Sequence, residues 1–413
     1  MTEAGLSGTA PPLDRSPQRR NRTMMIAGAA LFTLHGLIHL LGFAQAFGLA
    51  ELPQWGTPIS PFMGLLWLAA ALLAVITAAA MFRAPRWWWA WGAGAVVISQ
   101  IMIVSSWGDA KVGTVANVVL LVAVLYGFAS RGPLSLRAEF EHELTRSSSS
   151  ALSPSRGLIT EDDLTALPAP VQRYLRRSGV VGRPPVTDFR ATWTGRIRGA
   201  PDAAWMSFTA EQVDSVNPPR RLFMMDARMK GLPVDVLHVF DERGATMRVR
   251  LLSVAAMVNA KGAALTRAET VTLFNDWCCL APGALLELDV IWESIDNCSA
   301  AARFTLGVNT IGAVLRFDDS GDLVDFVADG RAMMSPDGRS LTPLRWSTPL
   351  RDYAQMGLAR VATTGEAKWH PDSGAWTYGE FALTSLVYNV THQDPPTHHD
   401  ADRPMIGHRG QAR

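Results

Sequence analysis

Cysteine is scarce in this sequence, with only three among 413 residues. Cys278 and Cys279 are adjacent and Cys298 stands alone, so neither a disulfide framework nor a CxxC metal motif is present. Neighbouring cysteines rarely bridge each other. We therefore expect reduced, buried thiols and a reducing compartment.

Charged residues are also few, at 18% of the chain, and they balance to a formal net charge of +1. A chain without a basic excess gives no reason to expect nucleic acid as a partner. The scarcity is uneven, because residues 23–130 carry almost no charge whereas residues 158–395 have the composition of a soluble domain. The chain is thus expected to have two different parts.

The short motifs of common enzyme families are missing as well. The sequence has no nucleophile elbow, P-loop, dinucleotide fingerprint or HExxH. His238 lies in the strand-like segment VDVLHVF, where we interpret it as a hydrogen-bonded sheet residue rather than a catalyst. These absences weigh against an enzyme, and no catalytic residue is assigned.

Long apolar runs, by contrast, are present at Met24–Leu49, Phe62–Phe82, Trp87–Trp107 and Val112–Ala129. Crossing a bilayer takes about 20 mostly apolar residues, so each run predicts a transmembrane helix. The first run is too long for a signal peptide, and three more follow it. The third begins with clustered tryptophans, which are typical of the headgroup level. Residues 23–130 are therefore predicted to form a four-helix transmembrane domain.

Arginines predict the orientation of this bundle. They precede the first run, separate the second from the third and follow the fourth, whereas the other two connections carry a single lysine, Lys111. By the positive-inside rule, the N-terminus and the C-terminal domain are cytoplasmic and the protein is a multi-pass protein of the inner (plasma) membrane. We expect residues 1–22 and 393–413 to be disordered tails and residues 131–157 to be a linker with a flexible SSSS segment.

Two histidines, His35 and His39, lie one helical turn apart in the first run and so share a helix face. Ionisable groups inside a membrane are candidate functional residues because burying them unpaired is costly. Further polar candidates of this region are Gln100, Asp109, Lys111 and Asn117.

Three interpretations of the histidines remain open. They could hydrogen-bond Gln100 or Asn117 and fix the packing of the bundle, form a quinone or proton-linked site, or bind a metal, for which no third ligand is evident. We favour the packing role and predict no cofactor, with a quinone or metal at this pair as the alternative. Asp109 and Lys111 are expected to form an interfacial salt bridge.

Residues 158–392 are predicted to form a β-rich soluble domain. A short helix begins at Pro170 and ends at Gly179, and from Phe189 onward apolar and polar residues alternate with the period of half-buried strands. Asp/Ser/Gly turns between such runs indicate hairpins. The expected fold class is α+β: the helical bundle, then a curved, mostly antiparallel sheet of ten or so strands with two or three helices. Four methionines, Met224, Met225, Met229 and Met247, are expected to make its apolar face adaptable.

One helix interrupts the strands. Thr266 and Glu269 match a capping box at its start, and Trp277 lies on its apolar face. Asp352 and Tyr353, with Glu366 and Trp369 further along the chain, are candidates for lining a pocket. Trp277, Asp352 and Tyr353 are therefore the candidate ligand-binding residues of this domain.

Several motifs of this domain resemble an uncharacterised bacterial domain family of unknown function. They are LPAPVQRYLRRSGVVGRPPV, WMSFTAEQ, NDWCCLAPGALL, LRFDDSGDLVDF and LRWSTPLRDYAQMGLARVATTGEAKW, within Leu158–Asn389. Some relatives place stretches like HGLIHLLGF and SWGDAK ahead of the domain, and the helical region is loosely similar to DoxX-type membrane proteins, some of which interact with quinone. The strand-rich layout also resembles lipoprotein carriers, whose half-barrel cradles acyl chains. The family resemblance implies no activity.

Three hypotheses follow. The protein is a membrane-tethered module that binds a lipid or another apolar small molecule, a structural or regulatory membrane protein that acts through protein contacts, or an enzyme, such as a quinone-linked redox protein that uses His35 and His39. The first is favoured. Membrane lipids are expected partners, and the oligomeric state is left open. A deep apolar concavity would support the first hypothesis, and convergence of His35, His39 and Gln100 on one pocket would support the third.

Overall fold

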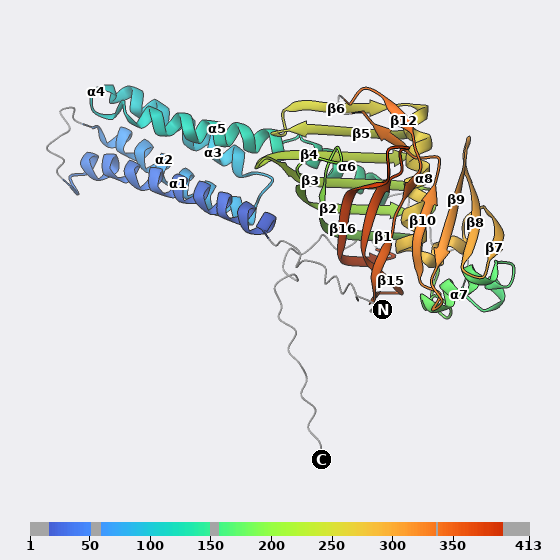
Figure 1. Ribbon diagram of the computed structural model, residues 1–413. Coiled ribbons are helices and arrows are strands. Elements are labelled where there is room, and N and C mark those ends of the chain that lie inside the picture. The colour runs from blue at the N-terminus through green and yellow to red at the C-terminus, as the bar shows by residue number, and fades with distance from the viewer. Residues whose placement is uncertain (1–15, 51–58, 149–156, 336–337, 391–413) are drawn as a thin grey trace, which may run out of the picture.

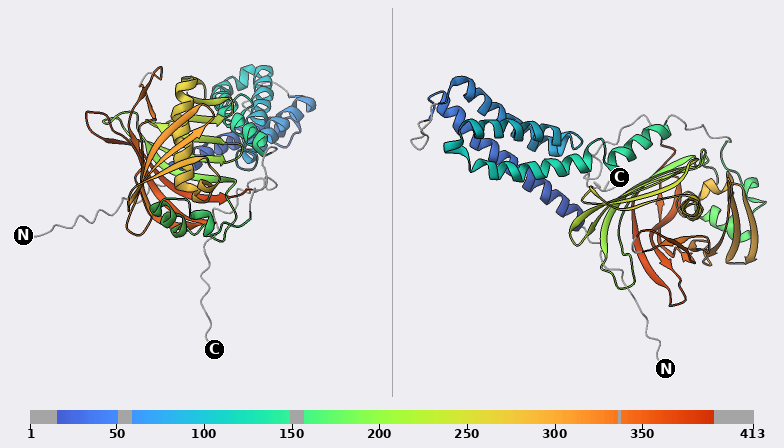
Figure 2. Two further views of the ribbon diagram at one scale, coloured as in Figure 1. Left: turned by 90° about the vertical axis from the view of Figure 1, so that its right-hand side faces the viewer. Right: turned by 90° about the horizontal axis from the view of Figure 1, so that it is seen from above.

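The computed structural model describes residues 16–50, 59–148, 157–335 and 338–390. A bundle of long helices lies beside a large β-rich domain, and a short helix, α6, lies against the outer side of the sheet (Figures 1 and 2). The expected α+β fold class is confirmed. The tail 393–413 and the segment 149–156 of the predicted linker fall outside the described residues.

The bundle contains α1 (Ser16–Ala46), α2 (Pro61–Arg83), α3 (Trp88–Ser105), the short α4 (Trp107–Ala110) and α5 (Gly113–Arg131). Four helical segments are long and apolar enough to cross a membrane: Thr23–Ala46, Pro61–Arg83, Trp88–Ser105 and Gly113–Arg146, the last of which includes α5. Helix α1 already begins at Ser16, so residues 16–22 are helical where a disordered tail was expected.

Small residues let the helices of the bundle approach each other closely. A Cβ added to Gly42 would lie 2.3 Å from the Trp67 ring, and one added to Gly36 would lie 3.0 Å from the carbonyl oxygen of Ala71. Large apolar side chains such as Leu34 and Leu37 are exposed on the outside of the bundle. Close contact through glycine and an apolar outer surface are features of helices packed in lipid.

The main sheet has 14 strands, and every pairing in it is antiparallel. Its order is β6-β5-β4-β3-β2-β1-β16-β15-β13-β10-β9-β8-β7, β14 pairs with β15, and β11 and β12 form a separate hairpin. The strands are β1 Asp188–Ile197, β2 Met206–Ser215, β3 Arg220–Met229, β4 Leu232–Asp241, β5 Gly244–Leu251, β6 Ala255–Lys261, β7 Val290–Asp296, β8 Ser299–Leu306, β9 Asn309–Phe317, β10 Leu323–Ala328, β11 Ala332–Met334, β12 Leu341–Pro343, β13 Trp346–Ser347, β14 Leu350–Met356, β15 Ala359–Trp369 and β16 Trp376–Tyr388. The alternation thus predicted the strands but underestimated their number.

Helix α8 (Ala263–Leu280) carries the chain from β6, at one edge of the sheet, to β7 at the other edge. It runs inside the curve of the sheet, as the two views of Figure 2 show. Fourteen of its 18 residues are buried, which agrees with a helix that is enclosed rather than packed on a surface. The short helix η2 (Pro282–Leu286) follows, and β7 begins at Val290.

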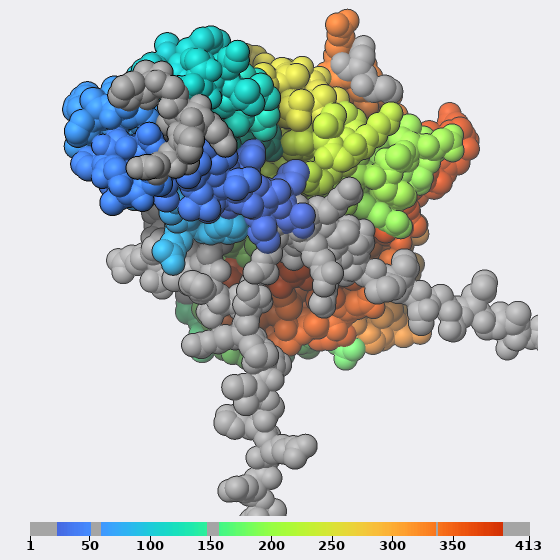
Figure 3. All heavy atoms as spheres, turned by 90° about the vertical axis from the view of Figure 1, so that its left-hand side faces the viewer, coloured from blue at the N-terminus to red at the C-terminus, as the bar shows by residue number. Residues whose placement is uncertain are grey.

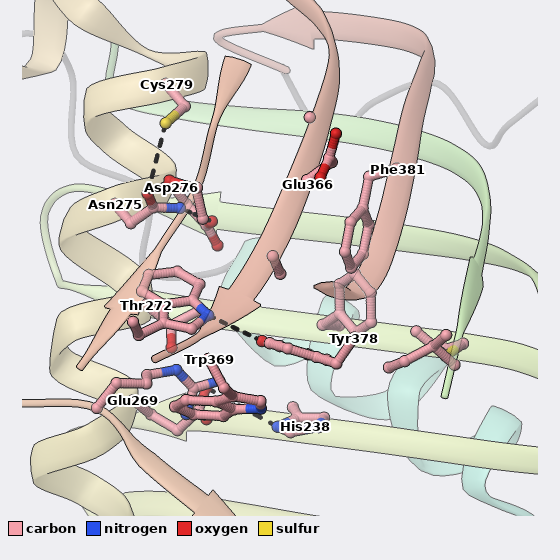
Figure 4. Close-up of a pocket in the computed structure, with 18 of the residues that line it drawn as sticks. His238, Glu269, Thr272, Asn275, Asp276, Cys279, Glu366, Trp369, Tyr378 and Phe381 are labelled. Atoms are coloured by element: carbon pink, nitrogen blue, oxygen red, sulfur yellow. Dashed lines mark hydrogen bonds and ion pairs between the residues drawn. The ribbon is translucent and has the colours of Figure 1, made fainter. Parts of the chain in front are cut away.

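The predicted capping box at the start of α8 is wrong. The helix begins at Ala263, and Thr266 lies in its first turn, where its hydroxyl donates to the Gly262 carbonyl and accepts a hydrogen bond from the Ala245 N–H, each at 3.0 Å. Glu269 instead points into the interior of the domain (Figure 4). Its tertiary partners are arginines, described below, which bind a buried carboxylate more strongly than a backbone amide would.

Helix α6 (Leu136–Ser148) lies within residues 131–157, the predicted linker, and its packing on the sheet was not expected. Leu136 and Phe140 are each 1% exposed and pack on the outer face of β3 and β4, against residues that include Met224. Met224 and Met225 are neighbours in a strand and therefore face opposite sides. Met224 lies on the outer face of the sheet, although it was expected on the inner apolar face.

Two short helices precede β1. The first is η1 (Asp162–Leu164), where the side chain of Asp163 accepts from the backbone and hydroxyl of Thr160. The second is α7 (Ala169–Arg177), which ends as predicted before Gly179, a residue with a φ of +72°. Tyr174 of α7 is fully buried and donates to the Cys278 carbonyl at 2.6 Å, which ties α7 to α8.

Candidate functional site

A cavity of about 350 Å³ lies between α8 and the concave face of the sheet. This is within the usual size range of small-molecule sites. Its walls are mainly apolar and aromatic, and Figure 4 shows side chains of α8 facing those of β15 and β16 across it. The apolar lining includes Trp193, Phe223, Met225, Met247, Met333, Trp346, Trp369, Trp376, Tyr378 and Phe381.

The polar atoms of two wall residues are already bonded to the protein. Trp193 donates its indole N–H to Gln212 at 3.1 Å, and Trp346 donates to the Tyr378 hydroxyl at 3.0 Å. Trp369 stacks on Tyr378 with ring centroids 5.2 Å apart. The wall therefore offers ring surfaces to a ligand more than it offers free hydrogen-bonding groups.

One side of the cavity carries a buried group of charges centred on Glu269 of α8. Its carboxylate lies 2.9 Å from an Arg331 Nη, 3.7 Å from an Arg221 Nη and 3.8 Å from His238 Nδ1. Burial alone would raise the pKa of Glu269, but Arg331, His238 and Arg221 outweigh it and lower the pKa to about 2. Glu269 is thus ionised at neutral pH.

A second carboxylate completes this group. Arg221 donates to Asp276 from Nε at 2.7 Å, and the Gln212 amide donates both to Asp276 at 2.7 Å and to Asp214 at 3.0 Å. Asp214 is fully buried, and burial together with the nearby Asp276 raises its pKa well above the usual range. The group thus pairs Arg221 and Arg331 with the carboxyl groups of Glu269 and Asp276, and Asp214 lies beside them.

His238 of β4 faces the cavity beside Glu269 (Figure 4). Burial lowers its pKa to about 4, although Glu269 opposes the shift, so the imidazole is neutral at physiological pH. The expectation of a hydrogen-bonded sheet histidine is wrong for Nδ1, which is buried without a hydrogen-bond partner among the described residues.

The cysteines of α8 are buried, as predicted, and are not bridged. Burial raises the pKa of both thiols well above the usual range, so neither is a reactive thiolate. In the part of the chain that the structure describes, no hydroxyl or thiol hydrogen-bonds His238, the arrangement that an activated nucleophile needs.

The bundle contains a separate polar network. His35 Nε2 and His39 Nε2 lie 3.2 Å apart, and both contact the Ser99 hydroxyl, at 3.0 and 2.7 Å. Ser99 donates to Asn117 at 2.9 Å, and Asn117 donates to Gln100 at 2.9 Å. The network joins α1, α3 and α5, and it brings together four of the predicted site residues.

Ser99 bridges both histidines to Asn117, and His35 also interacts directly with the Asn117 side chain, as expected for a packing role. Because the Ser99 proton goes to Asn117, Ser99 accepts from a histidine. His39 Nδ1 is buried without a partner, so a proton there would be an unpaired donor, and the proton of this ring is better placed on Nε2. Each hydrogen bond of the network then has one donor and one acceptor, and His39 Nδ1 is left as an acceptor without a partner among the described residues.

The remaining predicted site residues lie apart from both places. Asp109 and Lys111 are exposed near α4, and no ion pair joins them although both are described, so the expected salt bridge is wrong. Asp352 is exposed in β14, and Tyr353 donates to the Leu323 carbonyl at 2.6 Å rather than lining the cavity. Their predicted companions Glu366 and Trp369 do line it.

Trp277 is fully buried in α8 and borders a second cavity of about 300 Å³, near Phe304. The charged side of the cavity between α8 and the sheet could not be predicted, because Arg221, Glu269 and Arg331 are far apart in the sequence. The available signal was the pair Arg220–Arg221 directly before the apolar run Leu222–Met225, which places charge where a core residue is usual. For the bundle, the signal was Ser99, a hydroxyl one residue before Gln100.

Comparisons with known proteins cover the β-rich domain. A model described as a family of unknown function (DUF6544) matches residues 157–381, in agreement with the resemblance seen in the sequence, and no curated protein matches the chain. Among solved structures, a domain described as an outer membrane lipoprotein-sorting protein from Vibrio parahaemolyticus is 11% identical with a TM-score of 0.29, and covers 49% of this chain and 86% of its own.

Two further structures are similar in the same region. A DUF1329 family protein from Desulfovibrio piger is 12% identical, with a TM-score of 0.32 over 54% of this chain and 92% of its own. A LolA superfamily protein from Nitrosomonas europaea is 15% identical, with a TM-score of 0.27 over 56% of this chain and 96% of its own. At TM-scores of this size, nothing about ligand or activity follows for this chain.

Proposed function

This chain belongs to the family of unknown function DUF6544, and we propose that it is a membrane-tethered module that binds a lipid or another apolar molecule in the cavity between α8 and the sheet. The observation that carries the proposal is the cavity itself: about 350 Å³, walled by aromatic rings and methionines. A membrane-spanning bundle would keep the cavity close to a source of such molecules.

The pairing of both arginines inside the site supports a ligand without a charged group. Arg221 and Arg331 are held by Glu269 and Asp276, so an anionic group entering the cavity would compete with two carboxylates for the arginines. A cationic group would meet two arginines that already bind those carboxylates. We therefore propose a ligand with a long apolar part and at most a weakly polar end, whose burial contributes about 0.8 kcal/mol per CH₂.

The arginine pattern of the sequence supports the finer localisation. We propose that the four apolar helices cross the inner membrane and that the β-rich domain lies on its cytoplasmic side. Arg83 and Arg131 end α2 and α5, and Arg86 lies just before α3, so these helices have their arginines at the end that the positive-inside rule assigns to the cytoplasm.

Mass spectrometry of the purified full chain tests the binding proposal. Native spectra should contain an apolar molecule bound to the wild-type protein. In the variant Met333→Trp the larger side chain fills part of the cavity, and most of the bound molecule should be lost. The matched control is Met257→Trp, at an exposed position of β6 outside the lining, which should retain the molecule. Absence of any bound molecule from the wild type, or equal retention in both variants, would contradict the proposal.

A second candidate function is a quinone-linked redox activity in the bundle. The observation that favours it is that His35, His39 and Gln100 belong to one hydrogen-bonded network. In this case the same spectra should contain a quinone that is lost in the double variant His35→Leu/His39→Leu and kept in Met333→Trp. A ligand lost only from Met333→Trp assigns binding to the cavity.

A further inference from the structure

Three neighbouring hairpins of the sheet turn at the same end. The register pairs Ile197 with Met206, Met229 with Leu232 and Leu251 with Ala255, so residues 198–205, 230–231 and 252–254 lie side by side. We call this end, including Leu232, the turn edge. It presents three exposed apolar side chains at its hairpin tips: Leu232, 45% exposed, Leu252, 41%, and Val254, 71%.

The turn edge is the end of the sheet that lies next to the helical bundle. Arg131, the last residue of α5, acts electrostatically on Asp235, which follows Leu232 by three residues in β4. Arg250 donates to the Leu134 carbonyl just after α5, at 3.0 Å. In Figure 3 this end of the sheet, coloured green to yellow, lies beside the helices without being covered by them.

The composition of the turn edge fits a lipid headgroup layer. Besides the apolar tips, it carries the exposed Lys230, and Trp205 lies under two guanidinium groups, at 4.6 Å from Arg196 and 4.5 Å from Arg198. Tryptophan is enriched at membrane interfaces, and lysine and arginine bind anionic headgroups. Exposed apolar residues with a basic surround are also typical of protein segments that lie in this layer.

The cavity extends to the same end. Ile197, Arg198 and Gly199 belong to its lining, as do Trp376 and Tyr378 of the neighbouring β16. The Arg198 N–H donates to the Tyr378 carbonyl at 2.8 Å, which fixes this part of the wall against the first hairpin turn. A ligand that leaves the cavity here would therefore emerge at the turn edge.

We infer that the turn edge docks into the headgroup layer of the membrane that the four apolar helices cross, and that it places one end of the cavity against that leaflet. The inference rests on the proposed function for the membrane crossing and for the use of the cavity. The occupant of the surface is the bilayer itself: the tips are apolar, Lys230 and Arg198 outnumber the one acidic residue of the turns, Asp202, and the surface continues the apolar outside of the bundle.

Site-specific fluorescence in lipid nanodiscs tests the inference. In full-length protein with Cys298→Ser, a cysteine at Val254→Cys is labelled with the environment-sensitive dye NBD, since Cys278 and Cys279 are buried. The control is Val308→Cys, an equally apolar and 97% exposed position between β8 and β9, on the side of the domain away from the helices (Figure 1). Nanodiscs contain phosphatidylcholine and phosphatidylglycerol.

Docking predicts blue-shifted NBD emission at position 254 and several-fold stronger quenching there than at position 308 by a spin label on the lipid headgroup. Equal emission and quenching at the two positions would overturn the inference. If position 254 is in water while the purified chain still carries its apolar molecule, only the docking is wrong. If position 254 is in lipid and no molecule is bound, the proposed function is wrong and the docking stands.

Discussion

Glu269 is the residue on which the polar side of the cavity depends. It is 3% exposed and has Arg221, Arg331 and His238 around it. A carboxylate taken out of water is stable only when its partners replace the lost hydration, and removing one partner of such a group commonly costs about 3–5 kcal/mol. The group therefore fixes the position of α8 inside the sheet as well as the electrostatics of the cavity.

His238 should give the domain a measurable pH dependence. Its pKa falls from 6.5 to about 4 on folding, so the unfolded chain binds more protons between these pH values. Protonation of His238 does not affect the free energy of unfolding above about pH 6.5. As the pH falls from 6.5 to about 4, protonation of the unfolded chain lowers that free energy. By linkage the full effect is roughly 3 kcal/mol. The groups that face the ring are Glu269, Arg221 and Arg331, and Glu269 remains ionised throughout this range.

The variant His238→Gln isolates this effect. Asp325 acts in the opposite sense, because burial raises its pKa to about 6 and its contribution is lost as the pH rises. The difference in free energy of unfolding between wild type and variant removes the Asp325 contribution. We expect this difference to rise with pH from about 4 to 6.5 and then stay constant, in urea titrations followed by tryptophan fluorescence. Parallel curves for the two proteins would contradict a neutral, buried His238.

At the scale of elements, the regular features of the sequence were predictive. Alternation of apolar and polar residues predicted the strands, and four long apolar runs predicted the helices of the bundle. Local sequence pattern gave wrong predictions where tertiary contacts determine the role of a side chain. Thr266 and Glu269 match a capping box by spacing alone, but Glu269 forms ion pairs with arginines from β3 and from the start of the β11 hairpin.

Helix α6 shows the same limit. Its neighbouring serines, the SSSS segment, predicted a flexible linker. The structure packs Phe140 against the sheet and adds ion pairs along its length, among them Arg137 with Asp226 at 2.7 Å and Arg146 with Asp241 at 2.8 Å. No local pattern identifies partners 89 and 95 residues away.

The hydrogen-bonded network of the bundle should contribute to the cohesion of α1, α3 and α5. We expect His35→Leu/His39→Leu to insert normally but to melt at lower temperature in detergent, because Ser99 loses both of its histidine partners. Polar contacts of this kind contribute about 0.6–2 kcal/mol each in membrane bundles. The control is Leu37→Val, on the exposed face of α1.

Thermal unfolding followed by circular dichroism gives the melting temperatures of the wild type, the double variant and the control. The control should melt within the error of the wild type. A double variant that melts as the wild type does would show that the histidines do not hold the helices together, and would favour a ligand-binding role for the pair.

At the scale of the molecule, the chain combines an apolar bundle with a sheet that curls around one helix. The order of the sheet explains the curve: β6 and β7 are its two edges, and α8 connects them through the concave side. Because α8 occupies only part of this side, a cavity remains between it and β15 and β16 (Figure 4). The sequence predicted a curved sheet and an apolar inner face, but not how much of the concavity the helix would fill.

An experimental density map of the full chain, purified from its native membrane without exchange of bound lipid, tests the central claim most directly. We predict elongated density in the cavity, in contact with the rings of Trp193, Trp369 and Phe381 and with one end close to Glu269. A cavity closed by its own side chains, or one that contains only separate water molecules, would contradict the account.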